Sequence, residues 1–167
     1  SYLKGTDIAL EVIKEFTDTL SVDFFGAASN ENQDFIEEIA LIANANYQGI
    51  VASDKVEQLW SQYDLLIFPS REDGWGMAVH EAISNNTPVI CSIAAGASEH
   101  LIIDQGNGLI IKPDLTSLKD ALNLYFKDPQ LLLKHSECCV KHKENFSPDA
   151  TAKRFVKDVK LALEAKL

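Results

Sequence analysis

The chain has 167 residues, enough for one domain with a sizeable core, and its 46% apolar and 24% charged residues are ordinary for a globular protein. Lys and Arg number 15 against 25 Asp and Glu, and a formal net charge of −10 argues against nucleic acid or an anionic membrane as the main partner of this chain. No uninterrupted apolar run of about 18 residues occurs, and no basic segment precedes an apolar one near residue 1, so neither a membrane span nor a signal peptide is expected.

The first half of the chain alternates helical and strand patterns. Residues 6–16 repeat apolar side chains on one helix face, and Thr6 or Asp7 can cap this helix. The segments that follow are a strand at 22–26, a helix at 33–45, a strand at 47–51 with Gly49 inside it, a helix at 54–63 capped by Ser53 or Asp54, and a strand at 64–68.

The second half continues the alternation. Its segments are a helix from the "GWG" sequence to residue 85, strands at 88–92 and 108–112, a short helix at 96–104 between them, and closing helices at 116–127, 129–143 and 148–166. Strands that are apolar throughout and separated by helices indicate a parallel sheet covered on both faces. The prediction is a single doubly wound, Rossmann-like α/β domain over residues 1–167.

The cysteines predict no special chemistry. Cys91, Cys138 and Cys139 show neither metal-ligand nor disulfide spacing, so we expect buried free thiols in a reducing cytosol and no metal site. Two nucleotide-binding motifs are also missing: no G-x-G-x-x-G follows a strand, and no G-x4-G-K-[ST] occurs. A dinucleotide-dependent dehydrogenase and a phosphate-loop NTPase are therefore disfavoured.

The sequence "PSREDGWGMAVHEA" stands where ligands bind in such sheets, just beyond the carboxyl end of a buried strand. The start of the helix after Gly76 offers free N–H groups and a positive dipole end, which suits a diphosphate, and Gly74 and Gly76 would let the ligand come close. Asp73 and Glu81 could accept hydrogen bonds from paired sugar hydroxyls at two parts of one elongated ligand. The alternative is that Asp73 is only a helix cap and Glu81 only a surface residue.

Motifs along nearly the whole chain share one resemblance: "KGTDIALE", "FFGAAS", "YQGIVASDKVEQLWSQYDLLIFPS", "PSREDGWGMAVHEAISNNTPVI", "GASEHLI" and "NGLIIKPD". Their order and spacing resemble the C-terminal, donor-binding half of GT-B-fold, family 4 glycosyltransferases. Asp73 and Glu81 match the two family glutamates, with Asp73 one methylene shorter, and Asn86 replaces a common glycine.

The resemblance implies a role for each matching position. Asp73 and Glu81 would be the catalytic carboxylates, holding the transferred sugar and the ribose. Lys4 and the backbone N–H groups of the α-helix start would bind the diphosphate. The full set of substrate-binding positions is Lys4, Gly26, Ala27, Val51, Lys55, Gly74, Trp75, Gly76, Met77, Ala78 and Glu81, in which Val51 and Lys55 meet the base and Gly26 and Ala27 line the crevice wall. His80 is interpreted as a packing or surface residue, because consecutive helix positions point different ways.

The resemblance also implies a reaction. A sugar would move with retention from a nucleotide sugar, most simply a UDP-sugar with GDP as the alternative, to a glycan or lipid-linked acceptor of a bacterial surface polysaccharide, with no metal or other cofactor. The acceptor would bind a separate N-terminal domain, which would also make any contact with the inner face of the cytoplasmic membrane. The alternatives are a non-catalytic nucleotide-binding module and a GT-B-fold nucleotide-sugar epimerase or phosphorylase.

Two structural expectations follow from the resemblance. The family has a central first strand before its "KG", whereas only three residues precede Lys4, which predicts a gap or a borrowed strand between 22–26 and 64–68. The last helix, 148–166, would run toward the N-terminal domain, leaving Phe155, Val156 and Val159 poorly covered. The alternative is an ordinary amphipathic closing helix.

Overall fold

The structure, a computed structural model, describes residues 2–29 and 32–164, apart from the side chain of Phe146. Its strands are β1 (Val22–Phe25), β2 (Ala45–Gly49), β3 (Leu66–Phe68), β4 (Val89–Ser92) and β5 (Gly108–Ile111). Its α-helices are α1 (Thr6–Ile13), α2 (Gln33–Ala40), α3 (Val56–Trp60), α4 (Met77–Ser84), α5 (Gly96–Leu101), α6 (Leu115–Lys127), α7 (Pro129–His142) and α8 (Pro148–Glu164). Short 3-10 turns are η1 (Tyr2–Lys4), η2 (Lys14–Phe16), η4 (Ser53–Lys55) and η5 (Lys143–Phe146).

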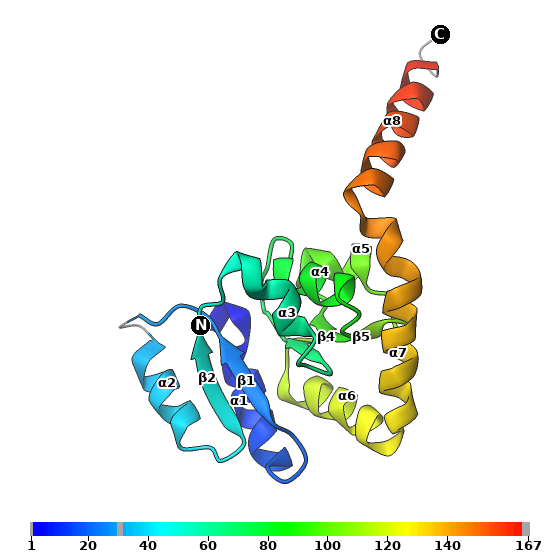
Figure 1. Ribbon diagram of the computed structural model, residues 1–167. Coiled ribbons are helices and arrows are strands. Elements are labelled where there is room, and N and C mark those ends of the chain that lie inside the picture. The colour runs from blue at the N-terminus through cyan, green and yellow to red at the C-terminus, as the bar shows by residue number, and fades with distance from the viewer. Residues whose placement is uncertain (1, 30–31, 165–167) are drawn as a thin grey trace.

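All strand pairs are parallel, and the strands form two separate sheets. β1 pairs with β2, while β3, β4 and β5 pair in that order (Figure 1). No pairing joins β1 to β3 within the described ranges, so the gap predicted between these two strands is observed. The parallel strands and intervening helices confirm the predicted Rossmann-like α/β architecture.

Strand β4 is the centre of the core, and all four of its residues are buried. Ile90 belongs to one apolar cluster with α1 and α6, whereas Val89 and Cys91 belong to a second cluster with α4 and α5. This division follows from the strand itself, because successive side chains point to opposite faces of a sheet. Helices therefore cover both faces of β4, as the uniformly apolar strand pattern predicted.

Several predicted boundaries and caps are wrong, for local reasons. The helix predicted at 33–45 ends at Ala40. The next strand starts at Ala45 rather than 47, because Ala45 already pairs with β1. This strand ends at Gly49, which has a left-handed φ of 75°. The N-cap of α1 is Gly5 rather than Thr6 or Asp7. The helix predicted at 54–63 starts as η4, so α3 is preceded by Lys55 and has no side-chain cap.

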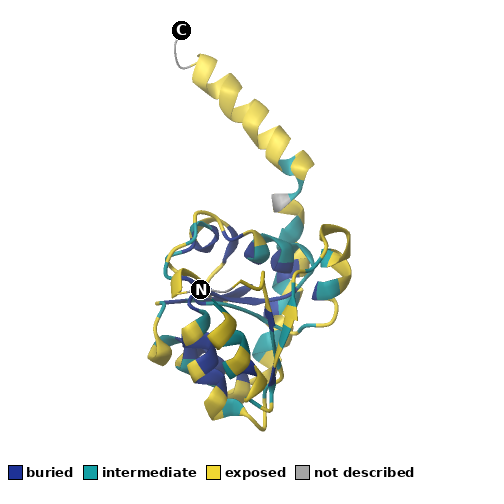
Figure 2. Ribbon diagram, turned by 90° about the vertical axis from the view of Figure 1, so that its left-hand side faces the viewer, coloured by how far each residue is buried: buried dark blue, intermediate teal, exposed yellow. Residues whose placement is uncertain are grey.

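Helix α8 projects from the body of the domain (Figures 1 and 2). None of its residues is buried, and Phe155, Val156 and Val159 are 69%, 51% and 41% exposed. The helix is therefore amphipathic without a partner in the described part of the chain.

The cysteines are free thiols, of which Cys91 and Cys139 are buried while Cys138 is only half-buried, against the expectation for all three. In the part of the chain that the structure describes, no helix has the length and apolar composition needed to cross a membrane.

Candidate functional site

The loop between β3 and α4, residues 69–76, is fastened to the loop that follows β4. The N–H of Asp73 donates to the Ala94 carbonyl at 3.2 Å, and the Asp73 carbonyl accepts from Gly96 N–H at 3.1 Å. The N–H of Ala97 donates to the Trp75 carbonyl at 2.7 Å. The segment that follows β4 therefore fixes the backbone of Asp73 and Trp75, which follow the neighbouring strand β3.

Glycines allow the two loops to meet. A Cβ on Gly96 would lie 2.4 Å from the Gly74 carbonyl oxygen, so only glycine fits there without movement. Gly76, the N-cap of α4, has a left-handed φ of 90°. By contrast, a Cβ on Gly74 would face open space, so the backbone itself requires glycine at 76 but not at 74. Close approach of a ligand to Gly74 stays a prediction.

Lys4 and Asp73, 69 positions apart, form an ion pair with 2.6 Å between Nζ and Oδ2. The Asp73 side chain, which is 15% exposed, also accepts from the Trp75 N–H at 3.1 Å. Partial burial acts to raise the pKa of Asp73, but the hydrogen bonds from Lys4 and Trp75 outweigh it, so this pKa is lowered. Because Gly76 rather than Asp73 is the N-cap of α4, Asp73 is not the helix cap considered from the sequence.

Lys4 is held in place by a residue that the sequence reasoning missed. Arg71 donates to the Tyr2 carbonyl at 2.7 Å, and its backbone N–H donates to the Leu3 carbonyl at 2.8 Å. Arg71 also forms a two-pronged ion pair with Asp7, at 2.7 and 2.8 Å. No sequence pattern pointed to Arg71, since a single arginine after a strand is not typical of any one kind of site.

The opposite end of the candidate site contains Glu81 and the start of α4. Glu81 is half-buried, and this burial raises the pKa of its carboxyl group. Within residues 2–29 and 32–164, its carboxylate makes no hydrogen bond or ion pair, and the N–H groups of Met77 and Ala78 donate to no protein acceptor. These acceptors and donors are left for a ligand or water.

Trp75 has an aromatic neighbour on helix α5. Its indole is 37% exposed and stacks on His100 of α5, with 5.7 Å between ring centroids and 24° between planes. His100 therefore joins the candidate site through Trp75, and the sequence analysis did not identify it.

The remaining predicted residues lie beyond the carboxyl ends of β1 and β2. Gly26 N–H donates to the Gly49 carbonyl at 2.9 Å, and the Ala27 carbonyl accepts from Asn32 at 2.8 Å. Val51 is half-buried, and Lys55 is exposed at the end of η4. The topology places all four beyond the carboxyl edge of the β1–β2 sheet, and no described hydrogen bond or ion pair connects them with 73–81.

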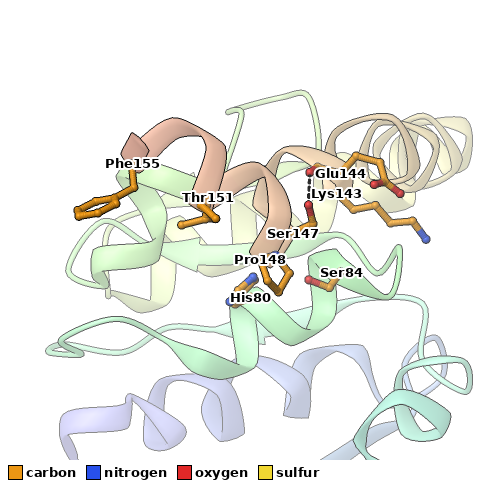
Figure 3. A pocket seen from close by; sticks show the side chains of 9 residues that line it. His80, Ser84, Lys143, Glu144, Ser147, Pro148, Thr151 and Phe155 are labelled. Atoms are coloured by element: carbon orange, nitrogen blue, oxygen red, sulfur yellow. Dashed lines mark hydrogen bonds between the residues drawn. The ribbon is translucent and has the colours of Figure 1, made fainter. Parts of the chain in front are cut away.

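A separate hollow of about 940 Å³ lies between α4 and the start of α8 (Figure 3). Its lining residues are His80, Ser84, Lys143, Glu144, Ser147, Pro148, Thr151, Ala152 and Phe155. No predicted ligand residue lines it. His80 faces this hollow, which agrees with its interpretation as a surface residue apart from Glu81.

An interrupted parallel sheet with a loop and helix start at its carboxyl edge defines a Rossmann-like α/β domain. The C-terminal domain of LpcC from Francisella tularensis, a glycosyl transferase group 1 family protein, superimposes with a TM-score of 0.72 at 22% identity, covering 89% of this chain and 82% of that one. HepE from Anabaena, solved in complex with UDP, gives a TM-score of 0.80 at 20% identity, covering 97% of this chain and 46% of that one.

Residues 1–146 match the family model of the glycosyl transferases group 1, and the chain therefore belongs to this family. A curated relative, the lipopolysaccharide core biosynthesis mannosyltransferase LpcC of Rhizobium leguminosarum bv. viciae, is 24% identical over 159 residues, which are 89% of this chain and 45% of that protein. The chain thus spans less than half the length of this relative.

Proposed function

We propose that this chain is the donor-binding domain of a retaining glycosyltransferase, which transfers a sugar from a nucleotide sugar to a glycan or lipid-linked acceptor. A UDP-sugar is the preferred donor, because HepE, of similar fold, was solved with UDP. GDP is the alternative nucleotide, and the mannosyltransferase relative makes mannose one candidate sugar. That relative's part in lipopolysaccharide core biosynthesis supports a role in surface polysaccharide assembly inside the cell.

One observation carries the proposal: a half-buried carboxylate and free helix N–H groups lie on the same short element. Burying Glu81 without a partner has a cost, which hydrogen bonds from the two ribose hydroxyls would offset. The N–H groups of Met77 and Ala78 would receive the diphosphate at the positive end of α4. Lys4 and Asp73 would contact the second phosphate and the transferred sugar.

The chemistry would consist mainly of positioning and charge stabilisation. The helix start and Lys4 would stabilise the charge that develops on the leaving diphosphate, and the donor's own phosphate would help to deprotonate the acceptor. Asp73 is an anion at neutral pH, and its lowered pKa extends this charge toward lower pH, so its carboxylate can accept from sugar hydroxyls. No metal or other cofactor has a step in this proposal.

The acceptor would bind a second, N-terminal domain of the same enzyme. The exposed apolar side chains of α8, including Phe155, Val156 and Val159, would pack against that domain. The residues that line the hollow beside His80 would contact it as well. Any attachment to the inner face of the cytoplasmic membrane would also go through that domain, because this chain carries a net charge of −10. The chain alone is therefore expected to bind donor without transferring sugar.

Calorimetric titration of the chain with UDP, UDP-glucose, GDP and GDP-mannose tests the proposal. Glu81→Ala removes hydrogen bonds to a charged group, typically worth about 1.5–3 kcal/mol, so it should weaken a nucleoside diphosphate and its sugar alike by about 10- to 150-fold. Asp73→Ala should weaken only the nucleotide sugar. It also releases Lys4 from its ion pair, so the affinity for UDP should stay unchanged or increase slightly.

Each outcome separates the proposal from an alternative. Equal weakening of UDP and UDP-sugar by Asp73→Ala would contradict the division of labour between the two carboxylates. If the chain binds donor but the full-length protein transfers no sugar to any acceptor, the chain is a non-catalytic nucleotide-binding module. Full-length protein that instead interconverts free nucleotide sugars would be an epimerase.

A further inference from the structure

We infer that Arg71 is a positioning residue for the donor diphosphate, since it holds Lys4 at the place where the phosphates would bind. The inference rests on the proposed function, and it adds a residue to which the resemblance assigns no role. Arg71 itself makes no contact with the proposed ligand groups. It acts through the N-terminal turn η1, which carries Lys4.

Arg71 fastens η1 by three contacts and the start of α1 by an ion pair. Its guanidinium donates to the Tyr2 carbonyl at 2.7 Å and lies 4.0 Å from the centre of the Tyr2 ring. Its backbone N–H donates to the Leu3 carbonyl at 2.8 Å, and both outer nitrogens pair with Asp7 at the start of α1. Residues on both sides of Lys4 are therefore tied to a single arginine.

The other side of Lys4 is equally constrained. Gly5 has a left-handed φ of 64°, and a Cβ there would lie 2.0 Å from the Pro69 carbonyl oxygen. The backbone of Gly5 thus packs directly on the residue two positions before Arg71. With Leu3 and Gly5 both fixed to residues 69–71, the Lys4 side chain is directed toward Asp73, two positions beyond Arg71.

The chemistry of Arg71 suits this task better than that of a lysine. Its planar group satisfies two carboxylate oxygens of Asp7, a carbonyl and an aromatic face at once. The hydrogen bond from Arg71 lowers the pKa of Asp7, which favours the ionised form of the pair. The Arg71 side chain is 24% exposed, and its removal should loosen η1 rather than unfold the domain.

The test measures UDP and uridine binding by calorimetry on the 167-residue chain. Lys4→Ala should weaken UDP about 10- to 150-fold and uridine hardly at all. Arg71→Ala should weaken UDP by a smaller factor, about 3- to 10-fold, and should also spare uridine. In the Lys4→Ala background, Arg71→Ala should cause no further loss, because Arg71 acts only through Lys4.

Two further variants keep the test independent of folding. Asp7→Asn loosens the same clamp from its other end and should lower UDP affinity in the same direction as Arg71→Ala. Lys119→Ala breaks the remote ion pair with Glu15 and should change neither ligand, so it controls for the loss of any surface charge. Arg71→Lys should not restore full affinity, since it cannot form the two-pronged pair.

The inference is overturned if Arg71→Ala leaves UDP affinity unchanged, weakens uridine equally, or adds its full effect to that of Lys4→Ala. Failure of the proposed function gives a different result. In that case Lys4→Ala and Glu81→Ala would also leave UDP affinity unchanged, and both proposals would be wrong. If those two variants weaken UDP but Arg71→Ala does not, only the role of Arg71 is rejected.

Discussion

The loop at residues 69–76 and the helix α8 represent opposite ways of holding a segment. Three parts of the chain, η1, α1 and the loop at 94–97, make hydrogen bonds to that loop. Helix α8 is 17 residues long, yet none of them is buried, and it projects away from the domain (Figure 2). The irregular segment is thus more firmly fixed by tertiary contacts than the regular one.

The difference has a physical reason. A helix satisfies its own backbone groups, so α8 can form wherever its sequence favours it, although marginally without tertiary packing. A loop must find partners for each N–H and carbonyl elsewhere, and the loop at 69–76 finds them in segments distant along the chain. We therefore expect substitutions that break the tertiary contacts of this loop to be costly and those on α8 to be nearly neutral.

Among substitutions at the loop and at α8, the largest effect should come from Gly5→Ala, where η1 packs on the loop. The new Cβ would lie 2.0 Å from the Pro69 carbonyl oxygen at a left-handed φ of 64°, so both strain and overlap oppose it. Together these should lower the free energy of unfolding by about 3 kcal/mol or more, as measured by urea denaturation.

Gly74→Ala is the matched control for this glycine. Its Cβ would face open space and no left-handed backbone is involved, so its free energy of unfolding should stay within about 0.5 kcal/mol of the parent chain. Similar losses for the two variants would mean that the contact between Gly5 and Pro69 does not hold η1 in solution.

The sequence predicted the order of the secondary-structure elements more completely than the contacts of the candidate site. The apolar runs gave the order of strands and helices, because burial on both sheet faces leaves a plain pattern. The motif placed Asp73 and Glu81 beyond β3, where the structure has them. Neither the motif nor the periodicity revealed the ion pair between Lys4 and Asp73 or the contacts of Arg71 with Asp7. The two residues of each pair are separated by 69 and 64 positions in the sequence, so their contact depends on tertiary packing.

An intermediate effect should come from the junction that precedes α8. His135 on α7 is buried, with its Nδ1 2.8 Å from the Tyr125 hydroxyl of α6, and burial lowers the pKa of His135 despite the nearby Asp104 carboxylate. The unfolded chain should therefore take up this proton first as the pH falls below about 6.5, and the folded state should lose stability in that range.

His135→Gln tests this expectation by urea denaturation between pH 5 and 8. The variant should lose about 1–3 kcal/mol at pH 8, where the wild-type contact with Tyr125 is intact, and should show a flatter pH dependence. If His135→Gln keeps the parent slope, His135 is not the group that joins α7 to the domain in a pH-dependent way.

The smallest effect should come from α8 itself, and a pair of identical substitutions measures it. Leu163 of α8 is 63% exposed, whereas Leu118 of α6 is fully buried. Leu118→Ala should cost about 2–5 kcal/mol, because it opens a cavity in the core. Leu163→Ala should change the free energy of unfolding by no more than about 0.5 kcal/mol, because no buried contact is lost and alanine favours a helix.

A loss above about 1 kcal/mol would show that α8 packs against the domain or a second copy, and a dependence on protein concentration would identify the latter. In a protein that also carries the proposed acceptor domain, the same Leu163→Ala should become costly if α8 packs on that domain, so its cost there measures that contact directly.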